Sequence, residues 1–412
     1  MLRRVVITGI GLITPLGLNL EDVWQAAVAG RSGTRRIDVF DASGLPSQVA
    51  GLVQGFQAQE IFGERQAKKL DRFLQFAVVA ARQAFTDSKL EKTDGDPRAG
   101  VVIGAGIGGL HTLEEQHLAM AEKGYRGIKT YFVPSMLSNL AAGMVSIEFG
   151  LRGPNLSTST ACAASNHAVG LAFHMLRANQ ADVMVCGGSE AAVTALSVAG
   201  FSKLRALSKR NDLPEKASRP FDRDRDGFVI AEGAGVLVLE ELEHAQKRGA
   251  SIYAEVSGFG MSSDAFHVTA PSPDGQGAAL AMENALTDAG ITAAQVNYIN
   301  AHGTSTPLND VVETRAIKLV FGKNTKVPIS SNKSMMGHML GAAGGVETAL
   351  TAMSIANGYI LPTINLEQPD PECDLDYTAG QGRQQAIDYA INNSFGFGGT
   401  NTCLVLKRYD GE

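Results

Sequence analysis

The chain has 412 residues, of which 44% are hydrophobic and 19% are charged. This length can fill a large core and two domain-sized units, and the composition excludes a disordered chain. The formal net charge of −6 excludes a global basic field, so we expect no nucleic-acid partner. No stretch approaches the ~20 apolar residues of a membrane-spanning helix, so we expect no membrane partner.

The cysteines are scattered along the chain and form no CxxC pair: Cys162, Cys186, Cys373 and Cys403. This pattern argues against a zinc site and against a disulfide framework, and it indicates a reducing compartment. The opening run MLRRVVITGIGLITPLG is interrupted by glycine and proline and lacks a clear signal-peptide cleavage pattern, so it predicts a first strand and turn. We expect a cytoplasmic protein without a metal or a cofactor.

Short β-rich runs alternate with longer helical patterns along the chain. Strands are predicted at residues 5–8, 100–103, 183–186, 235–240, 253–258, 296–300, 327–330 and 403–407. Helices are predicted at residues 72–87, 165–179, 277–289, 311–321 and 345–357. The mixture predicts an α/β protein with at least one buried sheet.

A weak internal repeat relates the two halves of the chain. GAGIGG, LSTSTACAAS, a helix and ADVMVCGGSEAA follow one another in the first half. AHGTST, ISSNKSMMGHMLGAAGG, a helix and INNSFGFGGTNTCLVL follow in the second. A repeat of this length predicts a duplicated domain, with halves at residues 1–250 and 251–412. No low-complexity linker separates them, so we expect a large shared interface.

Two motifs suggest ligand sites that their surroundings disfavour. GAGIGG at 104–109 follows a strand and fits GxGxxG, but the polar segment after it contains no clean second strand at the right distance. DRDRDG at 222–227 begins like a calcium loop, yet the twelfth position is Gly233 where glutamate is required. We interpret this second segment as a charged turn with internal ion pairs.

Cys162 stands among small residues at the start of a predicted helix. A free thiol is usually a small buried hydrophobe. At a helix N-terminus, however, unpaired N–H groups and a partial positive charge favour the thiolate, so we expect a lowered pKa. The small neighbours leave room for a substrate. We therefore predict that Cys162 is a nucleophile and that the other cysteines are structural.

Two histidines occupy second-half counterparts of the active elements of the first half. His302 ends a predicted strand, and His338 begins a predicted helix. We interpret the remaining histidines as satisfied polar residues or surface groups. Lys333 lies five residues before His338 in a segment otherwise poor in charge. It is either an exposed surface lysine or a partner of Glu347 on the following helix.

Four motifs in order, STACAAS, AHGTSTPLND, NKSMMGHMLGAAG and NSFGFGGTN, resemble the β-ketoacyl-acyl carrier protein synthases over nearly the whole chain. SRPFDRDRDGFVIAEGAG and GFGMSSDAFHVTAP favour the type II synthases of fatty-acid elongation. The resemblance implies a thiolase fold, in which two similar halves each supply a five-stranded mixed sheet and stack as layers αβαβα. It also implies a homodimer that acts with acyl carrier protein.

The resemblance further implies a decarboxylative Claisen condensation. Cys162 would take an acyl group from the phosphopantetheine arm of the carrier protein. Malonyl-acyl carrier protein would then lose carbon dioxide, and its C2 carbanion would attack the acyl-cysteine. His302 and His338 would donate N–H groups to the enolate oxygen, while Lys333 with Glu347 would fix the electrostatics around them.

Further site residues are implied by their match to the family motifs. Phe397 corresponds to a gate, and its backbone N–H would form an oxyanion hole with that of Cys162. Substrate contacts are implied for Ile107 and Phe201 in the acyl-pocket wall, Thr304 and Thr306 at the pantetheine arm, and Gly398 and Asn401 in the glycine-rich loop. A basic docking patch for the acidic carrier protein is implied for Lys68, Lys69 and Arg205.

Departures from the family pattern bear on the substrate. Asn332 and Met336 replace residues that are usually threonine, and Ala163 and Ala164 stand where Thr-Ser is commoner. A type II polyketide or polyene ketosynthase would carry the same catalytic set and is the alternative. A non-catalytic chain-length partner would lack Cys162. A degradative thiolase would have a second cysteine near the C-terminal glycine-rich loop, and NSFGFGGTN has none.

Overall fold

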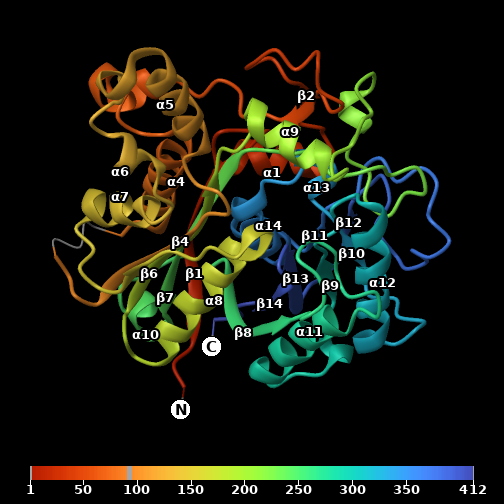
Figure 1. Ribbon diagram of the computed structural model, residues 1–412. Coiled ribbons are helices and arrows are strands. Elements are labelled where there is room, and N and C mark those ends of the chain that lie inside the picture. The colour runs from red at the N-terminus through yellow and green to blue at the C-terminus, as the bar shows by residue number, and fades with distance from the viewer. Residues whose placement is uncertain (1, 91–94, 412) are drawn as a thin grey trace.

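The centre of the molecule is a ten-stranded sheet with the strand order β10-β9-β13-β14-β8-β1-β7-β6-β4-β5 (Figure 1). The structure is a computed structural model that describes residues 2–90 and 95–411. The strand bounds are β1 Val5–Ile13, β4 Ala99–Gly104, β5 Asn155–Leu156, β6 Val183–Glu190, β7 Gly233–Glu241, β8 Ala254–Ser263, β9 Tyr298–Asn300, β10 Ile329–Ser330, β13 Tyr389–Gly396 and β14 Thr400–Lys407. Two small ribbons lie apart from this sheet, β2 Thr34–Arg36 with β3 Val49–Gly51 and β11 Tyr359–Ile360 with β12 Arg383–Gln384.

Each half of the chain supplies five strands in the same arrangement. The N-terminal half runs β5-β4-β6-β7-β1, and the C-terminal half runs β10-β9-β13-β14-β8. In both, the first two pairings are parallel and the next two are antiparallel. The two mixed sheets meet edge to edge, because Val5–Ile7 of β1 pairs with Ala254–Val256 of β8. The predicted fold class, with two duplicated halves, is confirmed.

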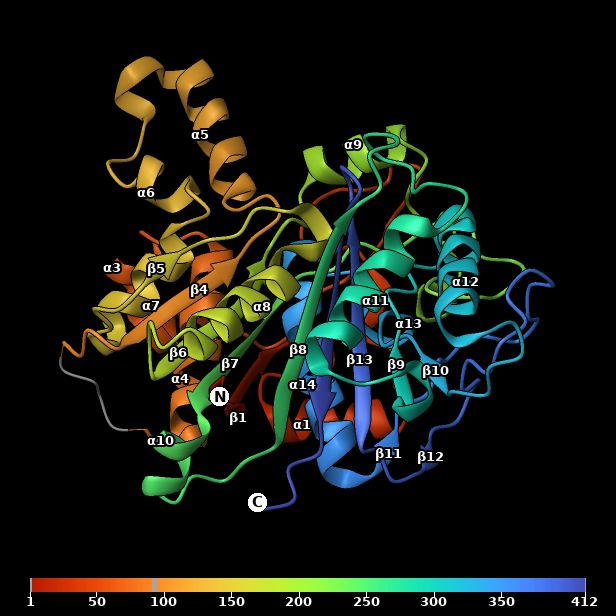
Figure 2. The ribbon, with the colours of Figure 1, turned by 90° about the horizontal axis from the view of Figure 1, so that it is seen from below.

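Helices cover the sheet in the order expected for αβαβα layers. α4 (Arg72–Ser88) packs on β1 and β7, and α11 (Gln276–Ala289) packs on β8 and β14. α8 (Ala164–Arg177) and α14 (Ala343–Asn357) pack on each other and on strands of both halves. Figure 2 shows α11 and α12 (Pro307–Phe321) beside the C-terminal strands, with α8 on the N-terminal side.

The close approach of α4 to β1 follows from residue size. Asp71 caps the helix by accepting the backbone N–H of Phe73, and the apolar stripe of the helix is buried. A Cβ atom on Gly11 of β1 would lie under 3.0 Å from the backbone oxygen of Ala80. Glycine in the first strand therefore lets the helix backbone rest directly on the sheet.

The predicted helices are all present, but sequence periodicity missed others. The additional helices are α1 Leu20–Val28, α2 Ala58–Phe62, α3 Glu64–Ala67, α5 Leu110–Lys123, α6 Phe132–Met136, α7 Leu140–Phe149, α9 Ala195–Lys203, α10 Leu242–Lys247 and α13 Lys333–Met336. α5 is largely exposed and polar, so it lacks a strong apolar stripe. Figure 2 shows α5 and α6 projecting away from the sheet. Across the described residues, every helix is too short or too polar to pass through a bilayer.

Candidate active site

A cavity of about 530 Å³ is lined by residues from both halves and gathers most of the predicted site residues. The predicted residues that line it are Ile107, Cys162, Phe201, Arg205, His302, Thr304, Thr306, His338, Phe397 and Asn401. Lys333 and Glu347 are buried behind the histidines, and Gly398 lies in the same loop as Phe397. Lys68 and Lys69 do not line the cavity.

Cys162 lies in a short 3₁₀ turn, Ala161–Ala163, that leads into α8; we refer to this turn as the cysteine turn. Ala161 has φ of 48°, which is unfavourable for a residue with a Cβ atom and therefore marks a strained position. The thiol is buried at the cavity wall. The backbone N–H groups of Phe397 and of Cys162 itself are directed at its sulfur. This is the pair of donors that was expected to form an oxyanion hole.

The expected lowering of the Cys162 pKa is wrong for this structure. Burial raises the pKa of the thiol to about 12. The charge of Lys333 and the two backbone N–H groups act in the expected direction but do not outweigh desolvation, and the nearby Glu190 carboxylate raises the pKa further. The helix start supplies donors to the sulfur, while burial of the sulfur keeps the resting group a thiol.

The two histidine rings lie together, with ring centroids 5.3 Å apart and the planes nearly perpendicular. His302 follows β9, and Glu313 of α12 holds this turn by accepting the backbone N–H of His302 at 2.8 Å and of Gly303 at 2.7 Å. His338 is placed by its backbone N–H, which donates to Val229 O at 2.7 Å. Both rings are buried and face the cavity.

Both histidines are neutral at neutral pH. Burial lowers the pKa of each imidazole well below its usual value, and the positive charge of Lys333 lowers it further. Lys333 Nζ lies 3.4 Å from Nδ1 of His302. An ammonium group can only donate, so Nδ1 accepts and Nε2 carries the proton. Neither ring nitrogen of His338 has a partner in the described part of the chain.

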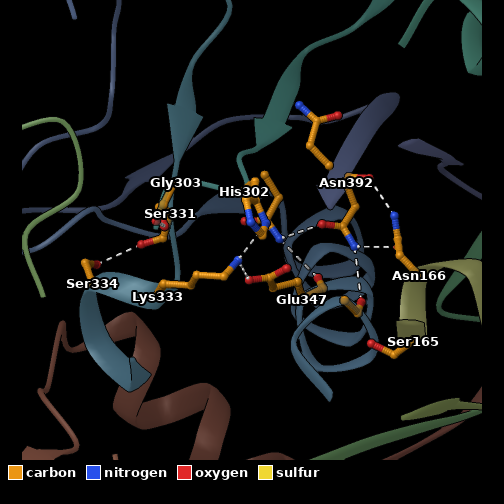
Figure 3. A network of polar contacts seen from close by, with 12 residues as sticks. Ser165, Asn166, His302, Gly303, Ser331, Lys333, Ser334, Glu347 and Asn392 are labelled. Atoms are coloured by element: carbon orange, nitrogen blue, oxygen red, sulfur yellow. Dashed lines mark hydrogen bonds and ion pairs between the residues drawn. The ribbon is translucent and has the colours of Figure 1, made fainter. Parts of the chain in front are cut away.

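Lys333 is a buried residue with two neighbours that hold it in place. Its side chain is 2% exposed and forms an ion pair with Glu347, which is equally buried. The alternative of an exposed surface lysine is therefore wrong, and the pairing with Glu347 is confirmed. Figure 3 shows the lysine reaching between His302 and the Glu347 carboxylate. The arrangement orients His302 and places a positive charge behind both rings.

The loop that carries Phe397 turns through two glycines in the left-handed region. Gly398 has φ of 85° and Gly399 has φ of 69°, where a residue with a Cβ atom would be strained. Gly398 N–H donates to Val268 O at 2.8 Å. Asn401 donates to Asp264 at 2.7 Å. The loop is thus tied to the segment after β8, and Asp264 is a cavity residue that the sequence motifs did not single out.

The predicted wall and arm residues are distributed along the cavity. Phe201 on α9 packs edge-on against Phe228 with ring centroids 5.4 Å apart, and it lies 6.5 Å from the Phe397 ring. Thr304 and Thr306 share a hydrogen bond of 2.9 Å between their hydroxyls. Ile107 lines the cavity and is also 40% exposed.

The three predicted docking residues do not form one cluster. Arg205 lines the cavity. Lys68 is exposed at the end of α3 and pairs with Glu64 at 2.9 Å. Lys69 donates to the Tyr131 hydroxyl at 3.2 Å. The two lysines lie on the α3–α6 side of the molecule, where Lys68 borders a separate hollow.

The glycine-rich GAGIGG turn binds a carboxylate of the protein itself. Glu190, at the end of β6, accepts the backbone N–H groups of Gly106, Ile107 and Gly108. The anion-binding face of the turn is occupied by this side chain, so the prediction against a nucleotide site is supported. Glu190 was not among the predicted site residues, although a glutamate at the end of an otherwise apolar strand is a usable signal.

The aspartate-rich loop is held together by ion pairs. Asp222 accepts from Arg219 at 2.9 Å and from three backbone N–H groups at 2.8 Å each. Arg225 is buried, 2.6 Å from Asp370 and 3.6 Å from Asp310. Within residues 2–90 and 95–411, no group of three or more potential ligands could hold a metal ion. The interpretation of this segment as a charged, ion-paired turn is confirmed.

Known proteins resemble the chain over its whole length. The family described as "Beta-ketoacyl synthase, N-terminal domain" matches residues 2–245, and "Beta-ketoacyl synthase, C-terminal domain" matches residues 253–367. A protein of Synechocystis sp. named 3-oxoacyl-[acyl-carrier-protein] synthase 2 is 52% identical over 99% of this chain and 98% of its own length. A protein of the same name from Coxiella burnetii is 52% identical over 98% of this chain and 99% of its own.

Solved structures agree with the sequence comparison. A ketosynthase in a type II polyketide complex, bound to its acyl-carrier protein and a hexaketide, superposes with a TM-score of 0.93 at 38% identity, over the full length of both chains. A β-ketoacyl synthase from Burkholderia phymatum superposes with a TM-score of 0.92 at 37% identity, over 99% of this chain and 100% of its own. The predicted resemblance is confirmed, and the chain belongs to the β-ketoacyl synthase family of condensing enzymes.

Proposed function

We propose that this protein is a 3-oxoacyl-acyl carrier protein synthase that elongates acyl chains by decarboxylative condensation with a malonyl thioester. The observation that carries the proposal is the cavity arrangement. One thiol faces two backbone N–H groups, and two neutral histidines line the same cavity. The relatives that are about half identical carry this activity in their names.

The first half-reaction is transfer of the acyl group to Cys162. The sulfur attacks the thioester carbonyl, and the N–H groups of Cys162 and Phe397 receive the developing oxyanion. The C–S bond to the pantetheine arm breaks as the new C–S bond forms. The thiol proton leaves Cys162 and the departing pantetheine sulfur gains a proton, so charge is conserved. Because the resting thiol has a raised pKa, proton removal is part of the barrier to this step.

The second half-reaction uses the histidines. The malonyl group loses carbon dioxide, and the electron pair of the broken C–C bond moves onto the thioester as an enolate. Nε2–H of His302 and an N–H of His338 donate to the enolate oxygen, as neutral imidazoles can. C2 then attacks the acyl-cysteine carbonyl, and the Cys162 sulfur leaves. Lys333 and Glu347 are positioning residues for His302.

Binding roles follow the position of each residue. Ile107 and Phe201 are assigned to the acyl-pocket wall, and Phe397 with Gly398 to the gate. Thr304, Thr306 and Asn401 are assigned to the pantetheine arm. Arg205, beside the cavity, and Lys68 and Lys69, at α3, are assigned to docking of an acidic carrier protein. Residues 1–250 are assigned as the half that carries the nucleophilic cysteine, and residues 251–412 as the half that carries the two histidines.

A homodimer in the cytoplasm is part of the proposal. Large apolar side chains are exposed over residues 110–149, namely Leu113, Leu118, Met120, Tyr125, Tyr131, Val133, Leu137 and Ile147. β5, at the edge of the ten-stranded sheet, belongs to the same side of the molecule (Figure 2). Apolar surface of this extent supports a protein interface. Light scattering should give twice the 43.4 kDa chain mass, and Val133→Asp should give the monomer.

The free cysteines support a reducing compartment.

The decisive experiment is mass spectrometry of the intact protein after incubation with a panel of acyl-carrier-protein thioesters, followed by malonyl-carrier protein. The proposal expects covalent acylation at Cys162 and release of a 3-oxoacyl product. Absence of any acyl-enzyme across the panel would contradict it. Preferential turnover of polyketide chains over saturated acyl chains would favour the polyketide alternative, which the structural neighbours keep open.

A further inference from the structure

The carboxylate of Glu190 joins two segments that are far apart in the sequence. It accepts the backbone N–H of Gly106 at 2.7 Å, of Gly108 at 3.0 Å and of Ile107 at 3.2 Å. It also accepts the N–H of Gly341 at 3.2 Å, from the other half of the chain. The side chain is fully buried. Across the described residues, no salt bridge to a cationic side chain balances its charge.

Both segments belong to the wall of the cavity. The first carries Ile107, and the second is the 3₁₀ turn Leu340–Ala342 that follows His338; we refer to it as the glycine turn. The two backbones touch, because a Cβ atom on Gly341 would lie under 3.0 Å from the nitrogen of Gly106. Glu190 itself does not line the cavity. Its carboxylate therefore acts from behind the wall, at the point where the two segments meet.

Only a carboxylate satisfies this arrangement. All four neighbours are donors, and an ionised carboxylate is an acceptor with about four lone-pair sites. An amide in the same place would turn its NH₂ group toward backbone N–H groups and leave at least one of them unsatisfied. Burial raises the pKa of Glu190 to about 7, although the four backbone donors act in the opposite direction. The donor set therefore accepts the ionised side chain at pH values above this pKa.

We propose that Glu190 is a positioning residue that fixes the Ile107 wall and thereby sets which acyl chain lengths load onto Cys162. The proposal rests on the proposed function of the cavity. Short acyl groups end close to the sulfur and do not reach the wall. Long acyl groups lie along the wall, so their binding depends on where the GAGIGG turn holds Ile107.

The test compares the wild-type protein with Glu190→Gln at about pH 8, where a carboxylate of this kind is ionised. The rate of Cys162 acylation is measured by intact-protein mass spectrometry with carrier-protein thioesters from acetyl to palmitoyl. We expect palmitoyl loading to fall roughly tenfold, while acetyl loading changes by less than about twofold. The ratio of the two rates is the readout, because a general loss of folded protein lowers both equally.

Asp87→Asn is the matched control. Asp87 is a partly buried carboxylate that also accepts a backbone N–H, from Ile10 at 2.8 Å, but it contacts neither cavity segment. Its variant should leave the palmitoyl-to-acetyl ratio unchanged. Should Glu190→Gln fail to fold, Glu190→Asp replaces it, because it keeps the charge but withdraws the oxygens by one methylene.

The outcomes separate this inference from the function on which it rests. A parallel loss at every chain length, or an unchanged profile, overturns the role of Glu190 while leaving the condensing activity intact. A wild-type protein that is acylated by no member of the panel overturns the proposed function, and the inference with it. A selective loss of long chains in the Glu190 variant alone supports both.

Discussion

The cysteine turn and the glycine turn have nearly the same backbone and carry different residues at their centres. Ala161 has φ of 48° and Leu340 has φ of 47°, and each is the first residue of a 3₁₀ turn that leads into a central helix, α8 or α14. Cys162 stands at the centre of the first turn, where two N–H groups face its sulfur. Gly341 stands at the centre of the second, where its N–H is taken by Glu190. The duplicated architecture offers two such positions, and only one holds a nucleophile.

The largest expected effect is at the cysteine turn. Cys162→Ala should abolish condensation, because the variant has no group to accept the acyl chain. Peptide mapping after acyl transfer to the wild-type protein should place the label on Cys162 alone. Label on Cys186, Cys373 or Cys403 would contradict the assignment of the nucleophile to the cysteine turn.

The histidines next to the glycine turn should affect the other half-reaction. His302→Ala and His338→Ala should each lower malonyl decarboxylation by about two orders of magnitude, which is the cost of losing one donor to an oxyanion, ~3 kcal/mol. Acylation of Cys162 should remain. The measurements are carbon dioxide release and acyl-enzyme formation on the same samples. Near-normal carbon dioxide release by either variant contradicts this division.

Gly341→Ala tests whether the glycine turn tolerates any side chain. The added Cβ atom would meet the Gly106 nitrogen and the Ala105 carbonyl carbon, both backbone atoms that cannot move aside. We expect a loss of about 2 kcal/mol in the free energy of unfolding, seen as a lower midpoint in urea. Gly44→Ala is the control, because its Cβ atom would have nothing within 4 Å. Equal midpoints for the two variants would show that the turn has free space.

Ile107→Phe tests the cavity wall where the GAGIGG turn meets the glycine turn. A larger side chain narrows the cavity at the wall that Ile107 forms. Palmitoyl loading should fall roughly tenfold and acetyl loading should stay within about twofold of wild type. The measurement is loading rate against chain length for both proteins. Equal loss at every length would place Ile107 off the path of the acyl chain.

The smallest expected effect is a change with pH. The pKa values of His302 and His338 lie below the usual value, so both rings are already neutral at pH 6 and gain protons only at lower pH. Decarboxylation by Cys162→Ala, which cannot form the acyl-enzyme, should change by less than about twofold between pH 6 and pH 8. A steep rise through pH 6.5 would show ordinary histidine pKa values and an open site.

The sequence predicted the features that depend on short segments. Cys162, His302 and His338 each stand in a motif of a few residues, and the duplication of the fold follows from the repeat. Features that depend on tertiary contacts were missed or left open. The pKa of Cys162 was expected to be low, but it is raised, because burial of the thiol is set by residues far away in the chain. Glu190 lies 84 residues from Gly106, so its position at the end of an apolar strand does not show which segment its carboxylate contacts.

The central position of β1 has a consequence for how the chain reaches its native state. β1 lies between β7 and β8, so one edge of this strand is completed only by residues near 235 and the other only by residues near 255. Pairings of such long sequence separation form slowly, since the loop between them must close first. Until then the apolar first strand has two open edges. Nascent chains of this protein should therefore depend on chaperones until most of the chain has been synthesised.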